Sequence, residues 1–159
     1  MPNEKPGEKS EKSDKKSIAN MTAKEIMTAE AWAVTPDMTV QAIMQELINK
    51  KFSGAPVVDS MKKCISVVSE VDLMKFAAAG GIKKQLSDFM DKLVSADNVL
   101  KVEKNDPFKE IFKHFLLNPV RRVIVVDSSN KVQGIISRRD ILKAFLAVEG
   151  QKEEQKPTT

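Results

Sequence analysis

The chain has 159 residues, 42% of them hydrophobic and 30% charged, which suits one ordinary domain or two very small ones that share a core. The net charge of +4 is mild, and seven Phe, one Trp and no Tyr offer few rings for base stacking, unlike a dedicated nucleic-acid binder. The single cysteine, Cys64, excludes an intrachain disulfide and a cysteine-rich metal site. We expect a cytoplasmic protein, because the sequence has no apolar run of membrane-spanning length and no secretory signal at its start.

The two ends of the chain are charged and poor in large apolar residues. Residues 1–19 alternate Lys with Glu or Asp, and residues 149–159 are similarly polar. Segments of this composition bury too little apolar surface to offset the entropy lost on folding. We therefore predict disordered charged tails at 1–19 and 149–159, with the folded region between them.

The folded region contains an internal repeat. When the sequence is shifted by 68 positions, residues 34–76 lie over 102–144 without a gap, and the motif VVDS at 57–60 falls on VVDS at 125–128. Upstream, KEIMT at 24–28 resembles SDFMD at a spacing of 63, so the second copy has five additional residues around 93–98. We predict repeat one at 20–79, a linker at 80–86, where Gly80 and Gly81 end a helix, and repeat two at 87–148.

Each repeat contains the same predicted elements in the same order. An extended piece (32–35 and 100–103) leads into an amphipathic helix, whose start in repeat two is marked by Asp106 as cap and Pro107 in the first turn. Two β-branched strands follow (55–58 and 64–68; 123–126 and 132–136), and a last helix begins at Ser69 or Ser137. The predicted fold class is α/β (α+β), with two β-α-β-β-α repeats packed sheet to sheet in pseudo-twofold symmetry, because neither repeat is large enough to be stable alone.

Four phrases of the sequence resemble the characteristic segments of CBS domains: FSGAPVVD at 52–59, VSEVDL at 68–73, VRRVIVVD at 120–127 and VQGIISRRDIL at 132–142. Their order, spacing and double occurrence make the chain similar to a tandem CBS pair (a Bateman module) over almost all of 24–147. The resemblance implies a regulatory module that binds AMP, ADP, ATP or S-adenosylmethionine between the repeats. It also implies a homodimer that signals to an effector protein in trans. We expect no required cofactor, and no metal site around the lone Cys64 or His114.

The resemblance also implies ligand-binding residues. In the family, the Asp of a Ser/Thr-x-x-Asp motif takes the ribose hydroxyls, which matches Ser69 with Asp72 and Ser137 with Asp140. A carboxylate can accept two vicinal hydroxyl protons, and a helix N-terminus attracts phosphate. Arg122 matches a phosphate-binding position of the family. The remaining residues of the predicted ligand-binding set are Ala33, Thr35, Phe52, Ser53, Gly54, Val67, Arg121 and Ile135.

The two predicted sites differ. The repeat equivalent of Arg122 is Gly54, so only one arginine is available for two sites. We expect the Asp72 site to prefer a phosphorylated ligand and the Asp140 site to be weaker or differently selective. Two positions depart from the family pattern: Ser66 replaces the usual Gly, and Met61-Lys62 replaces a turn that is usually richer in Gly or Asn.

Other interpretations of these residues stay open. Ser-x-x-Asp is also an ordinary capping box. Arg121 and Arg122 alternate sides of a strand, so one of them faces solvent. Arg138 and Arg139 stand in the first turn of a helix, where the macrodipole disfavours cations, which hints at an anionic neighbour.

No nucleophile, base and orienting group line up in the sequence, and His114 has no metal-ligand set near it, so we expect no enzyme activity. Two alternative functions remain. One is a ligand-free dimerisation or scaffold module. The other is weak nucleic-acid binding through the lysine pairs at 50–51, 62–63 and 83–84.

Overall fold

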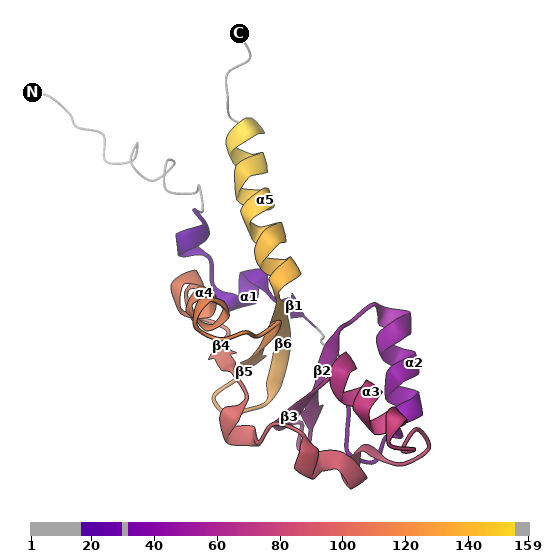
Figure 1. Ribbon diagram of the computed structural model, residues 1–159. Helices are drawn as coiled ribbons and strands as arrows, with labels where there is room; N and C mark the ends of the chain where they lie inside the picture. Colours follow the sequence, from indigo (N-terminus) through magenta and orange to yellow (C-terminus); the bar gives the residue numbers. More distant parts are fainter. Residues whose placement is uncertain (1–16, 30–31, 155–159) are drawn as a thin grey trace, which may run out of the picture.

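The computed structural model describes residues 17–29 and 32–154, with side chains to Gln151; the predicted tail residues 1–16 and 155–159 lie outside this range. The elements of the first half are η2 (Ile18–Asn20), α1 (Ala23–Ile26), β1 (Thr28–Ala29), α2 (Val40–Lys50), β2 (Gly54–Val58), β3 (Cys64–Ser69) and α3 (Glu70–Ala78). Those of the second half are η3 (Leu86–Lys92), η4 (Ala96–Asn98), β4 (Lys101–Glu103), α4 (Phe108–Leu117), β5 (Arg122–Val126), β6 (Val132–Ser137) and α5 (Arg138–Glu154) (Figure 1).

The strands form two sheets, one for each repeat. In repeat two the strand order is β1-β6-β5-β4, and β4 runs parallel to β5 with Val102 opposite Val125. In repeat one β2 pairs with β3, and Val34 makes a parallel bridge to Val57, which are the repeat equivalents of Val102 and Val125. The prediction of two β-α-β-β-α repeats is therefore confirmed, down to the parallel pairing at the first strand.

A small core cluster joins the two sheets. It contains Cys64 from repeat one with Val99, Ile124 and Val126 from repeat two, all at most 9% exposed. Burial raises the pKa of the Cys64 thiol, so this side chain stays neutral and acts as an apolar core residue. The hairpin tips also meet, because the Cys64 N–H donates to the Asn130 carbonyl at 3.0 Å. The sheets thus pack on each other, as expected for repeats too small to be stable alone.

The core of each repeat contains a short segment from the N-terminal part of the other repeat. Ala23 and Ile26 of α1 lie in the core of repeat two, together with Val123 and Val125. Conversely, Leu86 at the start of η3 is fully buried in the core of repeat one. The N-terminal pieces of the two repeats are therefore exchanged, which ties the repeats together beyond the contact of their sheets.

The helix ends follow local chemistry, with one correction. Gly80, at φ 83°, ends α3, and the Gly80 and Gly81 N–H groups donate to the Ala77 and Phe76 carbonyls, as in a Schellman motif. At the other end of the chain, α5 continues to Glu154, so residues 149–154 are helical and do not belong to a disordered tail. Gly150 does not end this helix, because one glycine costs only about 1 kcal/mol in a helix interior and its surroundings are open.

At the N-terminal end, η2 starts at Ile18, so residues 17–19 belong to the described structure and not to the predicted tail. Ile18 and Met21 pack against the core of repeat two. None of the described helices combines the length and the apolar character that crossing a bilayer requires.

Candidate functional site

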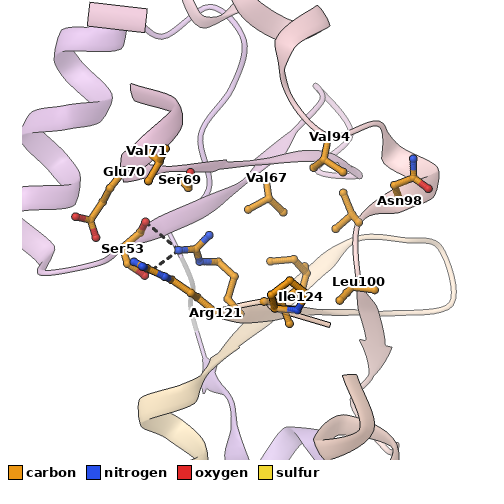
Figure 2. Close-up of a pocket in the computed structure, with 14 residues that line it drawn as sticks. Ser53, Val67, Ser69, Glu70, Val71, Val94, Asn98, Leu100, Arg121 and Ile124 are labelled. Carbon is orange, nitrogen blue, oxygen red and sulfur yellow. Dashed lines mark hydrogen bonds between the residues drawn. The ribbon is translucent and has the colours of Figure 1, made fainter. Parts of the chain in front are cut away.

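Two cavities lie between the repeats, and the repeat relates their lining residues. The first has a volume of about 380 Å³ and is bounded by Ser69 at the start of α3; we call it the Ser69 pocket (Figure 2). The second has a volume of about 500 Å³ and is bounded by Ser137, the repeat equivalent of Ser69; we call it the Ser137 pocket. Each pocket is lined by residues of both repeats, so its shape depends on how the repeats pack.

The Ser69 pocket has a largely apolar wall next to the start of α3. Val67 of β3 and Ile124 of β5 face each other across the cavity, with Val94 on the side of Val67 and Leu100 beside Ile124 (Figure 2). The acidic residue in this lining is Glu70, and the basic residues are Arg121 and Arg122. The pocket therefore combines an apolar floor with few charges at one end.

Ser69 and Asp72 form a capping box that uses only one carboxylate oxygen. Asp72 Oδ2 accepts hydrogen bonds from Ser69 N at 2.8 Å and from Ser69 Oγ at 2.9 Å, and Asp72 N donates back to Ser69 Oγ. Within the described part of the chain, Asp72 Oδ1 has no hydrogen-bond partner. The capping interpretation of this motif is thus correct, and it leaves one oxygen available to accept a further hydrogen bond.

Ser137 and Asp140 form the same box, with one addition. Asp140 Oδ2 accepts from Ser137 N at 2.8 Å and from Ser137 Oγ at 3.0 Å, while Asp140 Oδ1 accepts from the Thr28 hydroxyl at 3.1 Å. Thr28 belongs to β1, which pairs with β6 in the exchanged arrangement. Asp140 is only 8% exposed, so its carboxylate is more enclosed and more fully bonded than that of Asp72.

Arg122 lies between the two pockets and lines both of them. Its Nη2 donates to the Ser53 carbonyl and to Ser53 Oγ, each at 2.9 Å (dashed lines in Figure 2). The guanidinium occupies the space above Gly54, where an added Cβ would lie 2.5 Å from Arg122 Cζ. Gly54 is the repeat equivalent of Arg122, and the Arg122 side chain fills the space that Gly54, having no side chain, leaves open.

The environment of Arg122 disfavours its charge. Burial lowers the pKa of the guanidinium below its usual value, and the neighbouring Arg121 cation lowers it further. The carboxylates of Glu70 and Asp72 act in the opposite direction, without forming an ion pair with Arg122 in the described structure. The positive charge is consequently held by neutral oxygens of Ser53 and would be stabilised by an anion in either pocket.

The distribution of basic residues differs from the expectation drawn from the sequence. The Ser69 pocket was expected to be the phosphate-binding one, because Arg122 was assigned to it alone. The Ser137 pocket instead carries most of the cations. Its basic lining residues are Lys50, Lys51, Arg121, Arg122, Arg138, Arg139 and Lys143, and its acidic lining residue is Asp140.

Ser66 has a structural explanation that the family pattern did not suggest. This residue is 1% exposed, and its hydroxyl donates to the Val94 carbonyl at 2.6 Å. Val94 belongs to the five additional residues of the second copy. Together with Asn98 it lines one wall of the Ser69 pocket. Ser66 therefore fastens to β3 a segment that has no counterpart in repeat one.

Most of the predicted site residues reach a pocket. Those that line the Ser69 pocket are Ser53, Val67, Ser69, Arg121 and Arg122. Those that line the Ser137 pocket are Phe52, Ser53, Gly54, Arg121, Arg122, Ile135, Ser137 and Asp140. Three line neither: Ala33, Thr35, whose hydroxyl donates to the Asp37 carboxylate, and Asp72, which is hydrogen-bonded to the lining residue Ser69.

Several residues of the Ser137 pocket were not among the predicted site residues, although signals for them existed. Lys50 and Lys51 were predicted only as a lysine pair for weak nucleic-acid binding, and Arg138 and Arg139 only as cations near an anionic neighbour. For Thr28 and Lys143, the sequence contains no motif that indicates a binding role, only their place in the repeat. Among the described residues there is no cluster of three metal-binding side chains, and neither lining set includes a cysteine or a histidine.

Comparison with known proteins agrees with this geometry. The CBS domain family matches residues 23–79 and 86–147. Protein MJ1232 of Methanocaldococcus jannaschii is 32% identical over 127 residues, which is 80% of this chain and 40% of that protein. Inosine-5'-monophosphate dehydrogenase of Aquifex aeolicus is 31% identical over 112 residues, which is 69% of this chain and 21% of the enzyme.

Solved structures of similar fold include CBS-pair proteins. The crystal structure of CBSX2, an Arabidopsis thaliana protein, in complex with AMP has a TM-score of 0.69 at 25% identity and covers 81% of this chain and 98% of that one. An AcuB-type protein from Vibrio cholerae has a TM-score of 0.73 at 19% identity, covering 86% and 98%. With both repeats matched and the two-pocket geometry present, the chain belongs to the CBS-domain family as a tandem pair of repeats.

Proposed function

We propose that this chain is a regulatory module of the cytoplasm that senses an adenine nucleotide or adenosyl ligand and carries out no reaction of its own. The observation that carries the proposal is the pair of related cavities between the repeats, each bounded by the serine of a Ser-x-x-Asp helix start. The AMP complex of CBSX2, at 25% identity, supports the choice of ligand class.

The chemistry of the Ser69 pocket suits a nucleoside. Asp72 does not line the pocket, but it is hydrogen-bonded to the lining residue Ser69, and its Oδ1 would accept a hydrogen bond from a ribose hydroxyl that reaches past Ser69. Apolar side chains such as Val67 and Ile124 offer a surface for a purine ring. The first N–H groups of α3 and the Arg122 guanidinium would attract a phosphate. These groups bind and orient a ligand, and no step of bond making or breaking is assigned to them.

Binding would act by shifting how the two repeats pack. Each pocket has walls from both sheets, so a ligand that fits one packing better than another shifts the population toward it. The output would be read by an effector protein in trans. A homodimer is the expected assembly, because Met74 on α3 and its repeat equivalent Leu142 on α5 are 65% and 63% exposed, and a second copy would cover them.

A thermal-shift screen with AMP, ADP, ATP, S-adenosylmethionine and NAD tests the proposal. A ligand at one hundred times its Kd stabilises the fold by about 2.7 kcal/mol, which raises Tm by several degrees in a domain of this size. The shift should shrink in Asp72→Asn or Asp140→Asn, which keep the cap acceptor but lose the charge. Running the screen at two protein concentrations also tests the homodimer, whose Tm rises with concentration.

Glu110→Gln is the matched control, because Glu110 lies in the first turn of α4, away from both pockets. It should leave every ligand shift unchanged. If none of the five ligands raised Tm at millimolar concentration, the sensor proposal would fail and a ligand-free scaffold would be the better description.

A further inference from the structure

The two pockets carry different charge at positions that the repeat makes equivalent. Arg138 in the Ser137 pocket corresponds to Glu70 in the Ser69 pocket, and Arg139 corresponds to Val71. A third such position pairs Lys51 with Pro119. At each of these positions the Ser137 pocket has a cation where the Ser69 pocket has a neutral or acidic residue.

Apart from Arg122, which donates to Ser53, the basic side chains of the Ser137 pocket make no side-chain hydrogen bond in the described part of the chain. Among the described residues, Lys50 is the one member of this group with an ion pair, to Glu46 at 3.9 Å. Arg138 and Arg139 are the first two residues of α5, where the macrodipole repels cations. A group of like charges without counter-charges destabilises the folded state, and a bound polyanion would remove that repulsion.

The lining of this pocket contains one acidic residue, Asp140, against seven basic ones. Both oxygens of Asp140 already accept hydrogen bonds, Oδ2 from Ser137 and Oδ1 from Thr28. At 8% exposure, the carboxylate is also largely enclosed. The cations that surround it therefore point to a ligand with several negative charges.

We propose that the Ser137 pocket selects a nucleoside with two or more phosphates, whereas the Ser69 pocket accepts an adenosyl ligand with one phosphate or none. This inference rests on the proposed function, since it divides adenosyl ligands between the two pockets. The larger volume of the Ser137 pocket, about 500 Å³ against about 380 Å³, agrees with a longer ligand. Arg121 and Arg122 line both pockets, so the selection depends on Arg138, Arg139 and the lysines that only the Ser137 pocket contains.

Isothermal titration of the full chain with adenosine, AMP, ADP and ATP tests the division. ADP and ATP should bind at least tenfold more tightly than AMP at the same ionic strength. The double variant Arg138→Gln/Arg139→Gln should weaken ATP binding at least tenfold and leave adenosine binding within twofold. Lys83→Gln/Lys84→Gln removes the same charge from the exposed linker, outside both pockets, and should leave ATP affinity within twofold.

The outcomes separate this inference from the function on which it rests. If AMP and ATP bound equally well and Arg138→Gln/Arg139→Gln changed neither, the sensor would stand and the division by charge would be overturned. If adenosine and all three nucleotides failed to bind, the proposed function itself would be wrong. Inorganic tripolyphosphate binding as tightly as ATP would overturn the division, because the pocket would then recognise phosphate without a nucleoside. A short single-stranded oligonucleotide binding as tightly as ATP would also overturn it, because the basic residues would then serve nucleic-acid binding.

Discussion

At the scale of single residues, Gly54 and Arg122 depend on each other. They are equivalent positions of the repeat, and the guanidinium of one lies over the backbone of the other. A side chain at position 54 would meet Arg122 Cζ at 2.5 Å and the Val68 carbonyl at 2.7 Å. Arg122 of repeat two can take its position only because Gly54 of repeat one has no side chain there.

Gly54→Ala should therefore displace Arg122 and destabilise the fold. Overpacking of a dense site costs about 1–3 kcal/mol, and the cost should be smaller in an Arg122→Ala background, since two of the three closest contacts of the added Cβ are then absent. Denaturant unfolding of the two single variants and the double variant measures this coupling. Gly150→Ala is the control: nothing lies within 4 Å of its added Cβ, so it should stabilise α5 by up to about 1 kcal/mol. Equal costs for Gly54→Ala with and without Arg122 would contradict the dependence.

At the scale of elements, the two β-hairpins have the same turn built from different residues. Asp59 Oδ1 accepts hydrogen bonds from the N–H groups two and four residues later, and Asp127 Oδ1 does the same. In both turns a non-glycine residue is left-handed, Lys62 at φ 64° and Asn130 at φ 64°. Asn tolerates this conformation because its short polar side chain bonds locally, whereas Lys gains no such compensation.

Lys62→Asn should stabilise the first hairpin. Relief of the left-handed strain is expected to be worth about 0.5–1 kcal/mol, seen as a higher denaturant midpoint with an unchanged m-value. Met61→Asn, one residue earlier in the same turn and at 61% exposure, should give no gain, because its φ is not positive. If both substitutions raised the midpoint equally, a general preference for Asn in the turn would explain the result, and strain at Lys62 would not.

The same elements show what sequence can and cannot predict. The hairpins and the Ser-x-x-Asp helix starts were predictable, because turn residues and β-branched runs act locally and occur twice. The helix start at Asp106-Pro107 was predicted wrongly: Pro107 takes the N-cap position, and Asp106 Oδ2 instead accepts from Glu103 N at 2.8 Å. The Asp106 carboxylate could accept from an N–H at the start of α4 or from Glu103 N, and the turn after β4 brings it to Glu103 N.

The composition of the Ser137 pocket could not be predicted in this way. Lys50 and Lys51 lie at the end of α2 in repeat one, and Arg138 and Arg139 at the start of α5 in repeat two. Only the packing of the two sheets brings these distant segments to one cavity. The sequence shows each basic pair only as a separate surface feature. That both pairs line one pocket follows from the tertiary fold.

At the scale of the whole molecule, the exchanged segments make the two repeats one cooperative unit. Leu86, which the family assigns to the second repeat, is fully buried in the core of the first, and Ile26 of the first is buried in the core of the second. Opening either repeat therefore removes part of the other repeat's core. Coupling of this kind is what a sensor requires if a ligand in one pocket is to change the packing of the whole pair.

Leu86→Ala should consequently destabilise both sheets by the same amount. Truncating a buried leucine costs about 2–5 kcal/mol, and native-state hydrogen exchange should show this loss for the slowest amides of β5 and β6 as well as of β2 and β3. Leu117→Ala, at 70% exposure on α4, is the matched control and should leave both sets of amides unchanged. A loss confined to β2 and β3 would mean that repeat one opens alone, and a ligand in one pocket would then have no route through the core to the other.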